Sequence, residues 1–78
     1  MYTDEMRRAF RSLAGPKNFS LQIIDHDNFL TVKASENQFM SLTGEGKRSA
    51  VEYMAKVKSA LELNGAIVLL VREGGKEI

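Results

Sequence analysis

One histidine stands between two carboxylates in a short cluster of turn-forming residues. Asp25, His26 and Asp27 are followed by Asn28, and Asp and Asn favour turns because their side chains hydrogen-bond to nearby backbone. A histidine oriented by a carboxylate could act as a base, and a set of nitrogen and oxygen ligands could hold a metal ion. Consecutive turn residues rarely converge on one ion, and the chain has no cysteine and no second histidine to complete a site. We therefore expect His26 to belong to a solvated turn, with no metal site and no catalytic site.

A second candidate is the sequence Gly44-Glu45-Gly46-Lys47, which is similar to the end of a phosphate-binding P-loop. A P-loop requires a glycine five residues before Gly46 and a Ser or Thr after the lysine. Ser41 and Arg48 occupy those two positions, so the motif is incomplete. Because no nucleophile elbow, paired-histidine or calcium-loop pattern occurs either, we expect a protein that is not an enzyme and has no cofactor.

The basic residues are concentrated in two regions, although the net charge is only +1. Residues 46–58 contain four basic residues and one acidic residue. The second region contains Arg7, Arg8, Arg11 and Lys17. Backbone N–H groups at a helix start, followed by Lys47 and Arg48, would suit a phosphate backbone. The alternative interpretation is that these cations only keep two helices soluble.

Hydrophobic periodicity and breaker residues predict the elements that would position these groups. We expect a helix over residues 3–14, strands over 19–25, 29–34 and 38–43, a helix over 47–63 and a strand over 66–72. Gly15, before Pro16, is expected to end the first helix as a left-handed cap residue. The segment 36–42 could instead form one or two helical turns. The residues expected in the core are Phe10, Leu13, Leu21, Leu30, Val32, Met40, Met54 and Leu61.

These elements predict a single α+β domain over residues 1–78, with a loose tail at 74–78. The expected order is α-β-β-β-α-β, with a small, mainly antiparallel sheet and two helices packed on one face. The uncovered face and the apolar last strand predict self-association as a homodimer or with another protein, because a chain of 78 residues has little else to cover them. The residues expected in that patch are Phe29, Phe39, Val68 and Leu70.

Residues 44–61 resemble the second helix of a double-stranded RNA-binding domain. That family has a glycine-containing loop, a Lys-Lys-x-Ala-Lys helix start and further alanines, to which Gly44-Glu45-Gly46-Lys47-Arg48-Ser49-Ala50 is similar. The resemblance implies that Lys47 and Arg48 bind phosphates, and that the first helix and the loop with His26 touch minor grooves. The third lysine of the motif is replaced by Val51, and the loop around His26 is acidic.

If residues 36–42 are helical, the element order instead resembles a KH-type domain, another nucleic-acid-binding fold. The Gly-x-x-Gly clamp of that family is not present, since one residue separates Gly44 from Gly46.

The sequence therefore predicts a small nucleic-acid-binding domain whose partner is structured RNA. The expected contacts are Arg7, Arg8, Arg11, His26, Gly46, Lys47 and Arg48. The alternative is a protein-interaction or homodimerisation module without nucleic-acid binding. We expect a cytoplasmic protein, because there is no secretory signal and the longest apolar run, residues 66–71, is too short to span a membrane.

Overall fold

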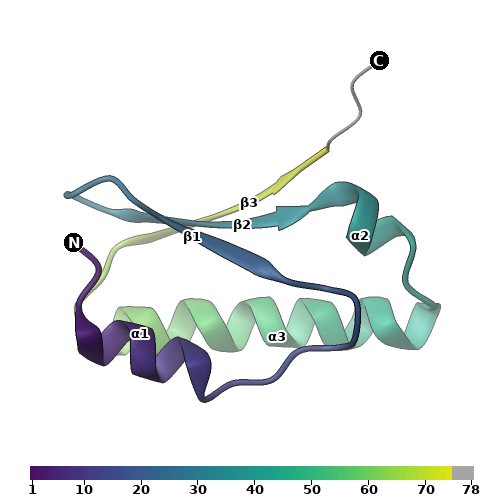
Figure 1. Cartoon of the computed structure of the whole chain (residues 1–78), viewed down its shortest axis with the longest axis horizontal. Coiled ribbons are helices and arrows are strands. Elements are labelled where there is room, and N and C mark those ends of the chain that lie inside the picture. Colours follow the sequence, from purple (N-terminus) through teal and green to yellow (C-terminus); the bar gives the residue numbers. More distant parts are fainter. Residues whose placement is uncertain (75–78) are drawn as a thin grey trace.

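The computed structural model describes residues 1–74 and has two layers, a three-stranded sheet and a pair of helices (Figure 1). The elements are α1 (Asp4–Arg11), β1 (Leu21–Asp25), β2 (Leu30–Ser35), α2 (Glu36–Met40), α3 (Gly44–Leu63) and β3 (Val68–Glu73). The predicted α+β class is confirmed, and α1 and α3 lie on the same face of the sheet (Figure 1). Of the expected tail, Gly74 belongs to no helix or strand, and residues 75–78 lie outside the described part of the chain.

The sheet is mixed, with strand order β1-β2-β3. β1 and β2 are antiparallel, and Ile23 lies opposite Val32. β2 and β3 are parallel, and Val32 lies opposite Leu70. A parallel pair needs a crossover connection, which α2 and α3 supply here. β2 is therefore the central strand, and β1 and β3 are the two edges.

The third strand predicted over residues 38–43 is wrong, because this segment contains α2. The Ser35 hydroxyl caps α2 by accepting a hydrogen bond from the Gln38 backbone N–H at 3.1 Å. The helix places Phe39 in the core, with its ring edge-on to Phe19 at 6.3 Å. Met40, expected in the core, is instead 57% exposed. The order is thus α-β-β-α-α-β, the order expected if residues 36–42 are helical.

The core between sheet and helices consists of two adjoining clusters. One contains Met6, Leu30, Val32, Val57, Leu61 and Val68, and the other contains Phe19, Ala34, Phe39 and Ala50. Leu30, Val32 and Leu61 are fully buried, as predicted. Four other expected core residues, Phe10, Leu13, Leu21 and Met54, are partly buried and pack against these clusters.

Three of the four residues expected on the open sheet face, namely Phe39, Val68 and Leu70, lie on the side that the helices cover. Phe39 and Val68 are buried in the two core clusters. In the parallel register Val68 lies opposite Leu30 and Leu70 opposite Val32, so both share the face that the helices cover. The open face carries Leu69 and Val71 instead. Leu70 remains 37% exposed because it lies near the sheet edge.

The ends of the two long helices also differ from the expectation. α1 ends at Arg11, with Ser12 as its C-cap, rather than at residue 14. Gly15 does not have a positive φ, so it is not a left-handed cap residue. α3 begins at Gly44 rather than residue 47, because the Thr43 hydroxyl accepts the Gly46 backbone N–H at 3.0 Å. No helix among residues 1–74 is long and apolar enough to cross a membrane.

Candidate nucleic-acid interface

The Gly44–Gly46 segment forms the first turn of α3 rather than a loop that could close on a ligand. The Gly46 backbone N–H donates a hydrogen bond to the Thr43 hydroxyl oxygen, and the Lys47 backbone N–H donates to the Thr43 carbonyl oxygen at 2.8 Å. A Cβ at Gly46 would lie 3.2 Å from the Leu42 Cβ, which is a tight contact. Gly46 therefore lets the chain turn closely into α3, and its backbone N–H is not available to a phosphate.

Lys47 and Arg48 differ in their exposure and in the contacts that their side chains already make. The Lys47 ammonium donates a hydrogen bond to the Leu42 carbonyl oxygen at 3.1 Å and is only partly exposed. This contact joins the side chain to the turn before α3. Arg48 is exposed and makes no hydrogen bond or ion pair with residues 1–74. Of the two phosphate-binding residues that the sequence predicts, Arg48 has no polar contact within residues 1–74, whereas Lys47 uses one of its three N–H donors within the chain.

The α1 arginines are likewise not equivalent. The Arg7 guanidinium lies 3.3 Å from the Asp4 carboxylate and 5.7 Å from the centre of the Tyr2 ring. Arg8 lies 3.9 Å from the Glu5 carboxylate. Arg11, in the last turn of α1, has no acidic partner in the described chain.

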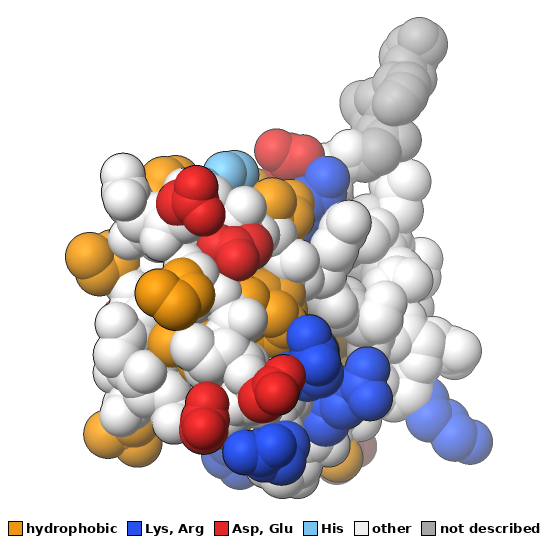
Figure 2. Space-filling model, turned by 60° about the vertical axis from the view of Figure 1, so that its left-hand side comes forward, with side chains coloured by type: hydrophobic (Ala, Val, Ile, Leu, Met, Phe, Trp, Pro, Cys, Tyr) orange, Lys and Arg blue, Asp and Glu red, His pale blue; other side chains and the backbone are white. Residues whose placement is uncertain are grey.

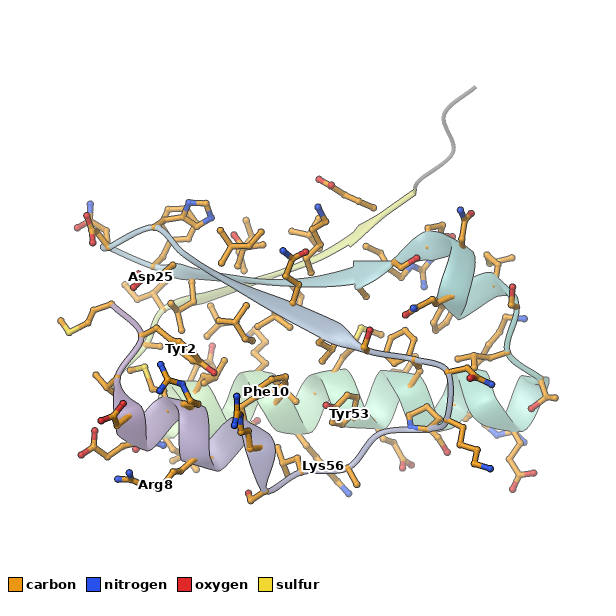
Figure 3. The ribbon with its side chains drawn as sticks, in the orientation of Figure 1. Tyr2, Arg8, Phe10, Asp25, Tyr53 and Lys56 are labelled. Carbon is orange, nitrogen blue, oxygen red and sulfur yellow. The ribbon has the colours of Figure 1, made fainter. Side chains whose placement is uncertain are left out.

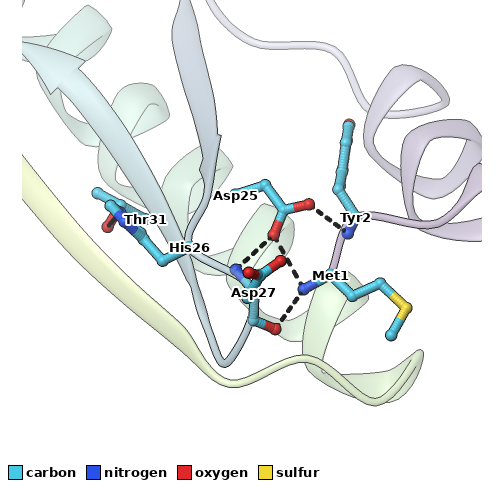
Figure 4. Close-up of polar contacts among 6 residues, drawn as sticks. All are labelled: Met1, Tyr2, Asp25, His26, Asp27 and Thr31. Carbon is cyan, nitrogen blue, oxygen red and sulfur yellow. Dashed lines mark hydrogen bonds and ion pairs between the residues drawn. The ribbon is translucent and has the colours of Figure 1, made fainter.

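His26 belongs to the open face of the sheet and not to a site with its two carboxylate neighbours. Its ring stacks on Phe29, with centroids 4.5 Å apart and planes 18° apart, and Nε2 lies 2.9 Å from the Thr31 hydroxyl oxygen. The Asp25 side chain points away from His26 toward the N-terminus of the chain (Figure 4). Within residues 1–74 no group of three His, Asp or Glu side chains could hold a metal ion.

Asp25 receives three contacts that favour its charged form. Its carboxylate accepts the backbone N–H of Asp27 at 2.9 Å and of Tyr2 at 3.0 Å, and lies 3.0 Å from the Met1 amino group (Figure 4). The hydrogen bond from Asp27 is the largest of the causes that hold the pKa of the Asp25 carboxyl below its usual value. The contacts join the β1–β2 turn to the chain before α1, so their role is structural.

Four cations make neither a hydrogen bond nor an ion pair with any group of residues 1–74, and all four lie in the helix layer or the loop beside it. They are Arg11, Lys17, Arg48 and Lys56, which we call the free cations. Lys17 follows Pro16 in the α1–β1 loop. Glu52 and Lys56 lie four residues apart on α3 but form no ion pair, whereas Lys58 pairs with Glu62 at 2.8 Å.

Lys56 projects on the side of the helix layer that faces away from the sheet, as does Arg8 (Figure 3). Beside it a shallow groove follows the contact between α3 and the α1–β1 loop, lined by Ala14, Gly15, Pro16, Ser49, Glu52, Tyr53 and Lys56. On the face that carries α1, Lys and Arg side chains gather on the lower part, with acidic side chains next to them (Figure 2). The helix layer therefore presents cations along α1, the loop and α3.

The structure does not bring all the predicted contacts together. The β1–β2 turn with His26 lies at the end of the molecule opposite the start of α3 (Figure 1), and the 20 residues of α3 span about 30 Å between the two ends. Arg8 projects from the helix layer away from the sheet, whereas His26 lies on the open face of the sheet (Figure 3). Lys56 was not among the predicted contacts. The sequence does not mark Lys56 as an unpaired cation, because Glu52 lies four residues before it on the same helix.

No protein-family model matches this chain, and neither does any curated protein or solved structure.

Proposed function

We propose that this chain is a small RNA-binding domain that contacts the phosphate backbone of duplex RNA through its helix layer. The observation that carries the proposal is the set of free cations, Arg11, Lys17, Arg48 and Lys56, in and beside α1 and α3. Phosphate contacts supply most of the affinity of non-specific nucleic-acid binding.

A duplex fits this surface better than a single strand does. Proteins that bind single strands stack successive bases on exposed aromatic side chains. In the helix layer Phe10 and Tyr53 are partly buried against the core clusters, and Tyr2 packs there too. Without a stacking platform, the backbone of a double helix is the part that the free cations can reach.

Four phosphate contacts would give weak binding that depends steeply on salt. Each neutralised phosphate contributes about −0.9 to the slope of log K against log salt for a duplex, so four contacts give a slope of about −3.6. Non-specific binding of this kind has a Kd of roughly 10⁻⁴–10⁻⁶ M at physiological salt. The acidic residues beside the free cations, such as Glu52, would keep the affinity at the weak end of that range.

The test is fluorescence anisotropy with a 20-base-pair RNA duplex, the matching single strand and the DNA duplex, from 50 to 200 mM salt. The variant R48Q/K56Q removes two free cations. Its matched control, R7Q/K58Q, removes the same charge from cations that are already paired with Asp4 and Glu62. We expect R48Q/K56Q to reduce the slope by about 1.8 and the control to leave it nearly unchanged.

Three outcomes would contradict the proposal. No binding of any probe at 50 mM salt would exclude nucleic-acid binding at this surface. Equal losses in R48Q/K56Q and R7Q/K58Q would show that overall charge, and not the free cations, decides binding. Tighter binding of the single strand than of the RNA duplex would exclude the duplex as the ligand.

A further inference from the structure

In the part of the chain that the structure describes, β3 has one paired edge and one free edge. Within residues 1–74 it pairs only with β2, in the parallel sense. The Leu30 N–H donates to the Ile67 carbonyl at 2.8 Å, so the backbone of Ile67 points toward β2. Because backbone direction alternates along a strand, Leu69 and Val71 also point toward β2. The N–H and C=O groups of Val68, Leu70 and Arg72 therefore point outward and can hydrogen-bond to another strand.

The side chains next to this free edge are apolar on both faces of the sheet. On the open face Ile67 is 70% exposed and Leu69 is 54% exposed. On the helix-covered face Leu70 is partly exposed, whereas Val68 is buried. A strand that pairs here must therefore bring apolar side chains to both faces. β3 itself meets this requirement, whereas β1 carries Gln22 on its open face.

The charged side chains of β3 do not prevent another strand from pairing with its free edge. Arg72 and Glu73 are the two charged residues of β3, and each is paired within its own chain. The Arg72 Nε lies 2.7 Å from the Glu36 carboxylate, and Glu73 lies 3.4 Å from the Lys33 ammonium. Edge strands that resist pairing commonly present an unpaired lysine or another charge. A second copy would meet no unpaired charge of β3.

We propose that two copies of this chain pair through β3 as an antiparallel homodimer with a continuous six-stranded sheet. Paired residues must lie on the same face of the sheet, so one residue of β3 must lie opposite its own copy, and the two-fold axis passes midway between these two copies. With the axis at Leu70, the outward-pointing residues Val68, Leu70 and Arg72 all exchange backbone hydrogen bonds with the second copy. Leu69 then lies beside Val71 of the second copy on the open face. A pairing of β3 with β1 would leave one β3 edge and one β1 edge free, so further copies could add in the same way and form an open filament. Pairing of β3 with β3 uses both β3 edges and therefore stops at the dimer.

This proposal does not depend on RNA binding, because β3 and the free cations lie on different elements. Sedimentation velocity from 5 to 200 µM tests it, with L70K as the disrupting variant. L70K would place two lysines opposite each other at the axis. Leu63 is 88% exposed on α3, so L63K is the matched Leu-to-Lys control. We expect a dimer for the wild type and for L63K, and loss of the dimer for L70K with unchanged circular dichroism.

Amide hydrogen exchange gives a test that requires no variant. The Leu69 N–H should be protected from exchange at every protein concentration, because it points toward β2. The Leu70 N–H should become protected only as the dimer forms. The chain has no cysteine, so single cysteines test the register. L70C should form an intermolecular disulfide on mild oxidation, because its Cα atoms would lie about 5.5 Å apart. L69C should do so more slowly.

A wild type that stays monomeric at 200 µM would overturn the homodimer. So would a dimer that persists in L70K, or a Leu70 N–H that exchanges equally fast at all concentrations. Equal cross-linking of L69C and L70C would overturn the axis at Leu70.

Discussion

Gly15 lies so close to the ring of Tyr53 that a Cβ at this position would be 2.5 Å from the Tyr53 Cδ2. The α1–β1 loop therefore packs directly on α3, and it does so because residue 15 has no side chain. The Tyr53 ring is held in turn by Phe19, whose ring lies edge-on at 6.4 Å.

We predict that Gly15→Ala lowers the free energy of unfolding by about 1–3 kcal/mol, the usual cost of overpacking. Tyr53 cannot move away without disturbing Phe19. Gly44→Ala is the control, since a Cβ at Gly44 meets nothing within 4 Å and Gly44 lies in α3. This second change should raise the free energy of unfolding by up to about 1 kcal/mol. Urea denaturation measures both, and two changes of the same sign would contradict the packing described here.

Leu61 and Leu63 lie two residues apart on α3 but in opposite surroundings. Leu61 is fully buried between the helix and the sheet, whereas Leu63 is exposed. Leu61→Ala should lower the free energy of unfolding by about 2–5 kcal/mol through lost burial and a cavity. Leu63→Ala should change it by less than about 0.5 kcal/mol. Because both variants replace Leu by Ala in one helix, equal effects in thermal or urea denaturation would show that the register of α3 is wrong.

The fold could be predicted from the sequence where the pattern is local. Alternation in β1 and β2 correctly predicts that Leu21, Leu30 and Val32 face the helices. β3 has no alternation, so its sequence cannot show which residues face inward. Only its pairing with β2, which sets Leu30 opposite Val68, decides this.

The segment that forms α2 could not be assigned for a similar reason. A short apolar-polar pattern over residues 38–43 fits a strand as well as a helical turn. The helix places Phe39 between Phe19 and the Arg72 guanidinium, which come from distant parts of the chain. A short stretch of sequence around residue 39 does not reveal these contacts.

The candidate site was only partly predictable, because each cation depends on its neighbours in space. The sequence correctly places Lys47 and Arg48 at the start of a helix. It does not show that Lys47 bonds to the Leu42 carbonyl, or that Lys56 makes no ion pair with Glu52. Those facts depend on how the turn before α3 and the side chains along it are arranged.

Arg72 connects the end of β3 to α2 in two ways. Its guanidinium lies over the Phe39 ring at 4.2 Å from the centre and pairs with Glu36. Arg72→Met keeps an apolar side chain over the ring but removes both charge contacts, so it should lower the free energy of unfolding by about 0.5–1 kcal/mol. A double-mutant cycle with Glu36→Gln measures the ion pair alone. A coupling energy of zero would show that Arg72 and Glu36 do not stabilise each other.

The contacts of Asp25 predict how stability depends on pH. Because its pKa is lowered in the folded chain, Asp25 contributes stability above the usual carboxyl value of 3.8, and this contribution is lost as the pH falls through the lower folded pKa. Asp25→Asn should therefore be less stable than the wild type at pH 7, and the two should converge in acid. The carboxylate of Asp27 makes no such contacts in the described chain, so Asp27→Asn is the control and should follow the wild type. Urea denaturation between pH 2 and pH 7, with a carbon NMR titration of the Asp25 carboxyl, checks this. A stability difference between wild type and Asp25→Asn that stays constant down to pH 2 would show that the ionised carboxylate does not hold the β1–β2 turn to the N-terminus.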